Sequence, residues 1–225
     1  MLDKIFPPIK NQKYSFLLAL IGTLLVFNIG IFMGYMIESS RIDKIQELYA
    51  NLEIKILDQI MQSNSMAILD LDCSLLKEEN IRFGDEIFME ALLIQKYENA
   101  NIFTDEIISQ HKRFDLLRAI FWINSIKIKE ECISDFHTVV YFYQYNDPSI
   151  EQKAKQIFFS NLLSELKNKF GNEIMLIPLS ADNDIPSINL MIQKYNITEL
   201  PVILIDEQVK VTEIENINDL DVYLN

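Results

Sequence analysis

Two cysteines are the residues of this sequence best suited to redox chemistry. Cys73 lies in DLDCSLL and Cys132 in KEECISDF, far apart along the chain. Oxidising surroundings preserve disulfides, so we favour a structural disulfide between them if they lie outside the cytoplasm. Two buried free thiols and a working redox pair are the alternatives. The redox pair is the least favoured, because neither cysteine lies at a predicted helix start beside basic residues, the setting that activates a thiol.

Four further side chains could bind a metal ion, but their spacing does not favour it. His111 and His137 are the two histidines, and neither has a Cys or a second His at ligand spacing. Asp182 and Asp184 in SADNDIP could attract Ca²⁺, but this loop lacks the Gly and the distal Glu of an EF-hand. We therefore predict no metal and no cofactor, and a polar turn at SADNDIP.

The stretch YFYQYNDPSI runs an apolar strand into a helix through Asn146, Asp147, Pro148 and Ser149. We predict Asp147 as the N-cap of this helix and Pro148 as its first residue, because these residue types favour those positions. Ser149 has no nearby histidine in the sequence to activate it, so we expect no serine nucleophile here. The stretch is therefore a strand-to-helix corner that lacks an obvious reactive group.

The composition is that of a folded protein and argues against nucleic acid as a partner. Hydrophobic residues make up 49% of the chain and charged residues 24%, with five Gly and six Pro among 225 residues, which is typical of a chain that packs a core. The formal net charge of −13 repels phosphates, and the sequence has no basic stripe with interleaved aromatic residues.

An apolar stretch near the amino end, residues 14–37, contains no charged side chain. As a helix it would cover roughly 36 Å, enough to cross the hydrocarbon core of a bilayer with some tilt. We predict a transmembrane helix; the alternative, a cleaved signal peptide, normally has a shorter apolar region and a small-residue cleavage site. More basic residues precede the stretch than follow it, which favours a cytoplasmic segment over residues 1–13 and an extracytoplasmic position for the rest.

Two features of the amino-terminal part permit a homodimer without requiring one. Gly30 and Gly34 form a GxxxG pair, which lets two membrane helices approach closely. Beyond them, apolar residues recur at steps of three and four along a helical seam: Ile42, Ile45, Tyr49, Leu52 and Ile56. The seam is too short to indicate a coiled coil by itself, so packing within the chain is an equal alternative.

Residues 38–134 are predicted to form an antiparallel helical module. They are periodically apolar and have little Pro or Gly punctuation, which does not suit a flexible linker. After the seam we expect a helix over 84–99, with Asp85 in its first turn, and another over 104–131, with Thr104 as N-cap.

From residue 135 the pattern becomes that of an α/β domain in the order β-α-β-α-β-β-α. The expected strands are 138–145, 173–180, 202–207 and 208–214, and the expected helices are 149–171, 185–196 and 216–225. The first strand shows no alternation, as expected of a strand buried on both faces. The first two strands are joined through a helix and should be parallel, whereas the last two should form an antiparallel hairpin.

The segment KYNITELPVILIDEQVKV resembles the thioredoxin superfamily, in which a helix ending in a Tyr-containing turn leads through a short loop to a cis-proline and a buried strand. The resemblance covers about residues 138–225 and implies a thioredoxin-like domain, here 135–225, with Pro201 as the cis-proline. Redox-active members carry Cys-x-x-Cys where the first strand meets its helix, but this sequence has Asn146 to Ser149 there. The resemblance thus implies the fold without its usual thiol chemistry.

These observations predict a single-pass, membrane-anchored protein with a thioredoxin-like domain that binds a protein partner, or acts as a scaffold, at the extracytoplasmic membrane surface. The resemblance implies a partner-binding face beside the cis-proline, formed by Asn146, Asp147, Pro148, Ser149, Leu200 and Pro201. The alternative function is a thiol-disulfide oxidoreductase that uses Cys73 and Cys132. A third possibility is a dimeric membrane stalk.

Overall fold

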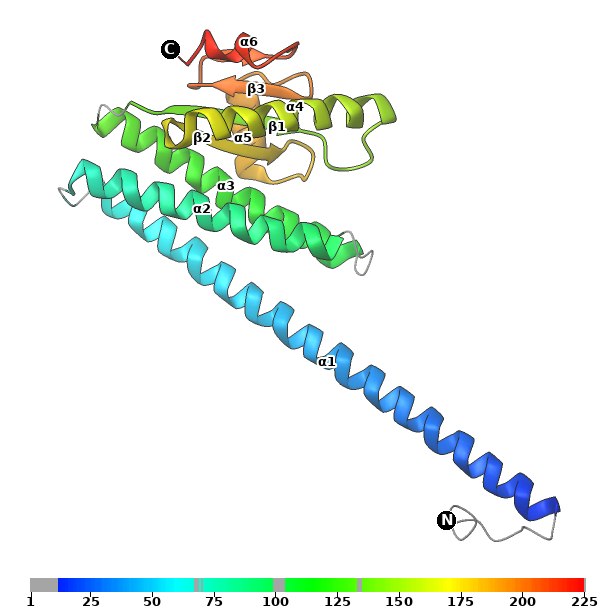
Figure 1. The fold of residues 1–225 in the computed structure, drawn as a ribbon. Helices are drawn as coiled ribbons and strands as arrows, with labels where there is room; N and C mark the ends of the chain where they lie inside the picture. Colours follow the sequence, from blue (N-terminus) through cyan, green and yellow to red (C-terminus); the bar gives the residue numbers. More distant parts are fainter. Residues whose placement is uncertain (1–11, 67–68, 70, 99–103, 133–134, 225) are drawn as a thin grey trace. The chain divides into compact units, whose positions relative to one another are not determined.

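The computed structural model describes residues 12–66, 69, 71–98, 104–132 and 135–224, and the remaining residues are traced in grey in Figure 1. Some side chains within the helices lie outside this description: residues 12–13, 38, 40–52, 93–98, 104–108 and 110. The predicted seam from Ile42 to Leu52 therefore lies outside the described side chains. The chain divides into two compact units, Met1–Ile54 and Lys55–Asn225.

The order of helices and strands agrees with the predicted order from residue 135 onward. The elements are α1 (Gln12–Met66), α2 (Cys73–Glu98), α3 (Thr104–Cys132), β1 (His137–Tyr143), α4 (Ile150–Phe170), the 3-10 helix η1 (Gly171–Glu173), β2 (Ile174–Ser180), α5 (Pro186–Lys194), β3 (Val202–Ile205), β4 (Val209–Val211) and α6 (Asn218–Asp221).

The first unit holds one helix that is long and apolar enough to cross a membrane. This stretch, Tyr14–Ile37, has 24 residues with a mean hydropathy of 2.4, and none of it is buried within the chain. Nothing lies within 4 Å of where a Cβ would stand on Gly30 or Gly34. A homodimer through these glycines stays a prediction.

The second unit begins with the last turns of α1, which pack with α2 and α3. Lys55 of α1 forms ion pairs with Glu86, at 3.3 Å, and with Glu90, both on α2. The buried amide of Asn80 on α2 donates a hydrogen bond to the hydroxyl of Ser125 on α3 at 2.9 Å. Polar side chains thus fix how these helices pair inside a largely apolar contact.

Helix α2 begins at Cys73, well before the predicted start at residue 84, so that prediction is wrong. The carboxylate of Asp72 accepts a hydrogen bond from the backbone N–H of Ser74 at 2.8 Å, which caps the helix at its true start. Gly84 lies inside the helix, where its missing side chain allows close packing. A Cβ on Gly84 would lie 2.8 Å from Cζ of Phe121 on α3.

The sheet has four strands in the order β2-β1-β3-β4 (Figure 1). Strand β1 pairs in parallel with β2 and antiparallel with β3, and β3 and β4 form an antiparallel hairpin. These pairings agree with the predicted ones. Residues 138–142 of β1 are all buried, as predicted for a strand covered on both faces.

Helices cover both faces of the sheet. On one face, Val139 and Tyr141 pack with Phe159 and Leu163 of α4 in a continuous hydrophobic core. On the other face, the ring of Trp122 on α3 lies 5.9 Å from that of Phe142, edge to face. Side chains alternate along a strand, so this division follows from the pleat of β1.

Helix α3 also contacts β2, which is an edge strand of the sheet. Pro178 lies in this strand, where it pairs with Tyr141 of β1. Proline has no backbone N–H and is therefore confined to edge strands within a sheet. The residue is consistent with the position of β2 at the edge.

The close approach at Gly84 yields a stability prediction. We expect Gly84→Val to lower the free energy of unfolding by about 1 to 3 kcal/mol, because the added atoms overlap the buried Phe121 ring. Urea unfolding followed by the fluorescence of Trp122, the single Trp, measures the change.

The exposed Ala154→Val on α4 is the control, and it should change stability little. The double variant Gly84→Val/Phe121→Leu should recover part of the loss, because Leu lacks the ring atoms that the new side chain meets. Equal stability of Gly84→Val and the parent chain would contradict the packing argument.

Candidate functional site

The strand-to-helix corner follows the end of β1 and leads into α4. Asp147 has a φ of 44°, in the left-handed region, and lies before the helix. Ser149 is the N-cap, and its hydroxyl accepts a hydrogen bond from the backbone N–H of Gln152 at 3.1 Å. The predictions of Asp147 as N-cap and Pro148 as first helical residue are therefore wrong. The left-handed turn at Asp147 delays the helix, and the Ser149 hydroxyl takes the capping role.

Asp182, in the loop after β2, holds the backbone of the corner. Its carboxylate accepts hydrogen bonds from the backbone N–H groups of Tyr145, at 2.8 Å, and Asn146, at 2.7 Å. The amide of Asn146 donates in return to the carbonyl of Asp182 at 3.0 Å. Asp182 thus lies in the predicted polar turn, and its carboxylate oxygens accept hydrogen bonds from backbone N–H groups.

Gln156 of α4 supports the corner from the helix side. Its amide accepts from the backbone N–H of Gln144 at 2.8 Å and donates to the carbonyl of Gln144 at 3.0 Å. The hydroxyl of Tyr141 donates to the carbonyl of Gln156 at 3.1 Å. Burial, with a smaller effect from Tyr143, raises the pKa of the Tyr141 hydroxyl, which therefore stays neutral. Gln144, the residue after β1, therefore makes its backbone hydrogen bonds with the side chain of Gln156 and not with a neighbouring strand.

A buried carboxylate on α3 anchors the loop that holds the corner. Asp115 accepts a hydrogen bond from the amide of Asn183 at 2.8 Å, and Nη1 of Arg118 lies 3.4 Å from its other oxygen. Burial raises the pKa of Asp115 more than Arg118 and Asn183 lower it. Sequence reasoning missed Asp115, since nothing near it in the sequence marks it as a partner of a distant loop.

The other half of the predicted face, Leu200 and Pro201, lies at the same end of the sheet as the corner. Phe142 pairs with Val202, so residues that follow β1 and residues that precede β3 meet at this end. The Leu200–Pro201 peptide bond is cis, Pro201 is buried and Leu200 is half-buried.

Three residues of the corner are exposed: Asn146, Asp147 and Ser149. They offer an amide, a carboxylate and a hydroxyl, and the hydroxyl already caps α4. The corner has no thiol. Its groups suit hydrogen bonding to a partner better than nucleophilic chemistry.

The two cysteines form a disulfide, as predicted. The sulfurs of Cys73 and Cys132 are 2.09 Å apart and the Cα atoms 5.5 Å apart. The bond joins the first residue of α2 to the last residue of α3. It therefore fixes the two helices covalently at one end.

The position of Cys73 differs from the sequence-based expectation. Cys73 is exposed and is the first residue of α2, so the expectation that neither cysteine lies at a helix start is wrong for this one. The N-terminal end of a helix stabilises negative charge, which would favour a thiolate there if the bond opened. The sequence did not reveal this because the start of α2 was expected beyond Cys73.

Two adjoining cavities, of about 450 and 590 Å³, lie between α2 and α4. We call the combined hollow the α2–α4 groove. Residues that line both cavities are Phe88, Ala91, Arg118, Tyr141, Ser160 and Pro178. Tyr145 and Pro148 of the corner line the larger cavity, so the groove adjoins the corner. No sequence signal predicted the groove, because its walls come from elements far apart in the chain.

The turn between β3 and β4 joins the sheet to α3 through two carboxylates. Asp206 and Glu207 both have left-handed backbones, with φ of 49° and 58°. Glu207 accepts hydrogen bonds from Nε1 of Trp122, at 2.6 Å, and from the hydroxyl of Thr138, at 2.7 Å. These residues were predicted as the end of a strand, which is wrong, because the chain turns here. The backbone N–H of Gln208 donates to the carbonyl of Ile205 at 3.1 Å, and positive φ at both residues between them is the geometry of a type I′ turn.

Asp206 is surrounded by donors. Nζ of Lys129 lies 2.5 Å from Oδ1, Nδ1 of His137 lies 2.6 Å from Oδ2, and the backbone N–H of Thr138 donates to Oδ1 at 3.0 Å. Burial acts to raise the pKa of Asp206, but the hydrogen bonds from Lys129, His137 and Thr138 together lower it. The carboxylate is thus held in its charged form.

The histidines take part in packing and hydrogen bonding. The ring of His111 lies 3.9 Å from that of Tyr145, centroid to centroid, and His137 contacts Asp206. Within the part of the chain that the structure describes, no group of three or more His, Cys, Asp or Glu side chains is arranged to hold a metal ion.

Comparisons with known proteins do not assign this chain to a family. Neither a protein-family model nor a curated protein matches it. Among solved structures it is similar to thioredoxin O2 from Arabidopsis thaliana in the oxidised state. The match has 20% identity and a TM-score of 0.30, over 48% of this chain and 85% of that one. At that TM-score the likeness carries no argument about fold or activity.

Removing the disulfide should destabilise the protein. We expect the double variant Cys73→Ser/Cys132→Ser to lose about 4 kcal/mol of unfolding free energy in the chain-entropy model, since the bond closes a loop of 59 residues. Urea unfolding of this variant, beside the oxidised and the reduced parent chain, measures the loss. A double variant as stable as the oxidised parent would contradict the prediction.

The charged state of Asp206 gives a pH dependence. Its folded pKa is lower than the ordinary value of 3.8, so its stabilisation is fully present above that pH and is lost as the pH falls through the folded pKa. Asp206→Asn keeps a residue type tolerant of positive φ but removes the charge. We expect this variant to be less stable by about 1 to 3 kcal/mol at neutral pH.

The measurement is the difference in unfolding free energy between parent and Asp206→Asn as a function of pH. The difference should shrink as the pH falls below 3.8. Asp184→Asn, at an exposed position that also has a positive φ, is the matched control. A difference that grows as the pH falls below 3.8 would contradict the assignment.

Proposed function

We propose that this chain is a single-pass membrane protein whose thioredoxin-like domain binds a protein partner at the extracytoplasmic surface. The observation that carries the proposal is the corner. Asp182 and Gln156 fix its backbone, and Asn146, Asp147 and Ser149 present no thiol there. A rigid, exposed surface without a reactive group suits binding better than catalysis.

Several observations support the fold and the location. The strand pairing, the helices on both faces of the sheet and the cis Leu200–Pro201 bond agree with the thioredoxin-like resemblance. The disulfide supports an extracytoplasmic location, because such bonds persist in oxidising compartments. The apolar helix over Tyr14–Ile37 supports a single membrane span.

Two single-cysteine additions test the topology. A membrane-impermeant maleimide should label Ser149→Cys in intact cells, whereas Lys4→Cys should react only after the membrane is permeabilised. Both cysteines of the parent chain are in the disulfide, so the parent has no free thiol that would react with the maleimide. Labelling of Lys4→Cys but not Ser149→Cys in intact cells would reverse the proposed orientation.

Site-specific photo-crosslinking tests the binding face. A benzophenone amino acid at Asn146 should crosslink the full-length chain to a discrete protein in the host membrane. The same group at the exposed Glu213, after β4, is the control and should not. Crosslinks that are absent, or identical at both positions, would remove the proposed face.

A second function, thiol-disulfide exchange at Cys73 and Cys132, is favoured by one observation: Cys73 is exposed at the first turn of α2. A graded series of reduced and oxidised dithiothreitol distinguishes the two functions. A bond that stays closed until the protein unfolds supports binding, and a bond that opens readily in the folded chain supports the oxidoreductase.

A further inference from the structure

The α2–α4 groove differs in charge from the rest of the chain. The protein has a net charge of −13, yet the two cavities are lined by the cations Arg118, Lys153 and Lys167 and by one carboxylate, Asp85. The remaining lining is mainly apolar and aromatic. An occupant that complements this lining must therefore be apolar and carry negative charge.

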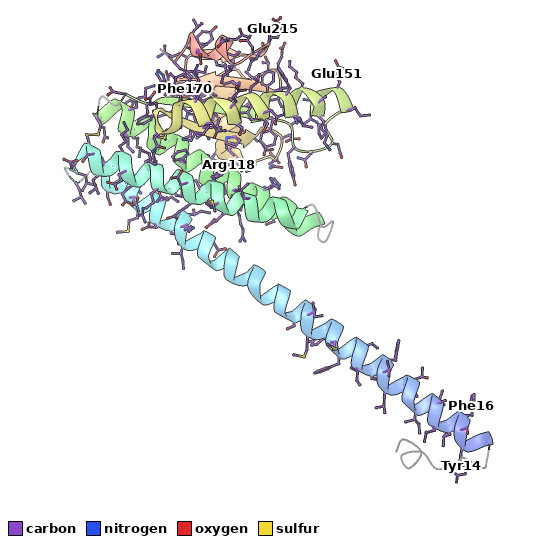
Figure 2. All side chains as sticks on the ribbon, viewed as in Figure 1. Tyr14, Phe16, Arg118, Glu151, Phe170 and Glu215 are labelled. Carbon is purple, nitrogen blue, oxygen red and sulfur yellow. A yellow bond between two sulfur atoms is a disulfide. The ribbon has the colours of Figure 1, made fainter. Side chains whose placement is uncertain are left out.

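Arg118, labelled in Figure 2, is the cation that lines both cavities of the groove. Its side chain is only 13% exposed, and Nη1 lies 3.4 Å from Asp115. Nε and Nη2 make no hydrogen bond with any residue that the structure describes. A guanidinium with two unused nitrogens in an apolar wall favours a carboxylate, which it can bind through two parallel hydrogen bonds.

The second cation, Lys167, is already committed within the chain. Its ammonium group donates to the carbonyls of Gly171, at 2.7 Å, and Ile174, at 2.9 Å. Burial lowers the pKa of Lys167 more than nearby Asp85 raises it. Two donors of Lys167 are thus used within the chain, whereas Arg118 has nitrogens to offer to a ligand.

The apolar lining of the groove is itself exposed. Phe88 and Leu92 on α2 are 62% and 45% exposed, and Ile157 on α4 is 53% exposed. An open hollow with exposed apolar side chains on both walls suits a polypeptide segment that lays its own apolar side chains along it.

We propose that the α2–α4 groove binds a segment of a partner protein that has apolar side chains and a carboxylate paired with Arg118. This inference rests on the proposed partner-binding function and extends the contact surface from the corner to the groove. The shared residues Tyr145 and Pro148 make the two surfaces continuous.

Selection from a displayed library of random twelve-residue peptides tests the proposal. The target is the full chain in phosphatidylcholine nanodiscs, with empty nanodiscs removing lipid binders. Selected peptides should be rich in apolar residues and in Asp or Glu. Ser160→Trp fills the groove from an exposed position of α4 and should abolish binding, whereas Asn161→Trp, one residue along the same helix, should not.

A double-mutant cycle then tests the proposed ion pair. Arg118→Gln should lower the affinity for the selected peptide by roughly tenfold or more. Replacing the peptide's Asp or Glu by its amide should lower the affinity by a similar factor. The two changes together should cost little more than either alone, since both remove one contact. Arg118→Lys should restore part of the affinity, and Lys155→Gln, outside the groove lining, should have no effect.

Three results would overturn the proposal: additive effects in the cycle, selected peptides without acidic residues, or binding that survives Ser160→Trp. Competition by laurate without any groove-dependent peptide would assign the groove to an amphiphile instead. Failure of the wider function is distinguishable, because it would remove the crosslinks at Asn146. A failure confined to the groove would leave those crosslinks and make them insensitive to Ser160→Trp.

Discussion

The second unit depends on a single helix, α3, fitting two surfaces at once. Trp122 on α3 packs edge to face on Phe142 of the sheet and donates a hydrogen bond to Glu207. Asp115, about two turns earlier on the same side of α3, binds the loop after β2, and Phe121 packs into the space left by Gly84 on α2. Because a buried carboxylate is costly unless its hydrogen bonds are made, these contacts define one position of α3 relative to the sheet.

The parts of the fold that the sequence predicted correctly are those with local signals. The unbroken apolar run of β1 and the Gly171 that ends α4 each depend on nearby residues. The start of α2 was missed because Gly84 resembles a helix boundary, and only the distant Phe121 explains its presence inside the helix. The corner residues were located, but their cap was not, since a left-handed Asp147 is set by Asp182 and the loop around it. The groove and Asp115 depend on contacts between distant elements.

The hydrogen bonds of the corner are directed inward. Asp182 and Gln156 use their side chains to satisfy the backbone around residues 144–146, so the outward-facing groups keep a defined arrangement. The disulfide likewise restricts movement of α2 and α3, because it joins one end of α2 to one end of α3. Rigid walls reduce the entropy that a partner must overcome on binding.

Both edges of the sheet are poorly suited to pairing with another strand. Pro178 interrupts the N–H groups of β2, α3 contacts that strand, and β4 spans only three residues, Val209–Val211. Backbone hydrogen bonds with an extended partner, a common way of recruiting a peptide to a sheet, are therefore disfavoured at both edges. Recognition through the proposed surfaces would therefore rely on side chains, and substitutions there could alter it without disturbing the sheet.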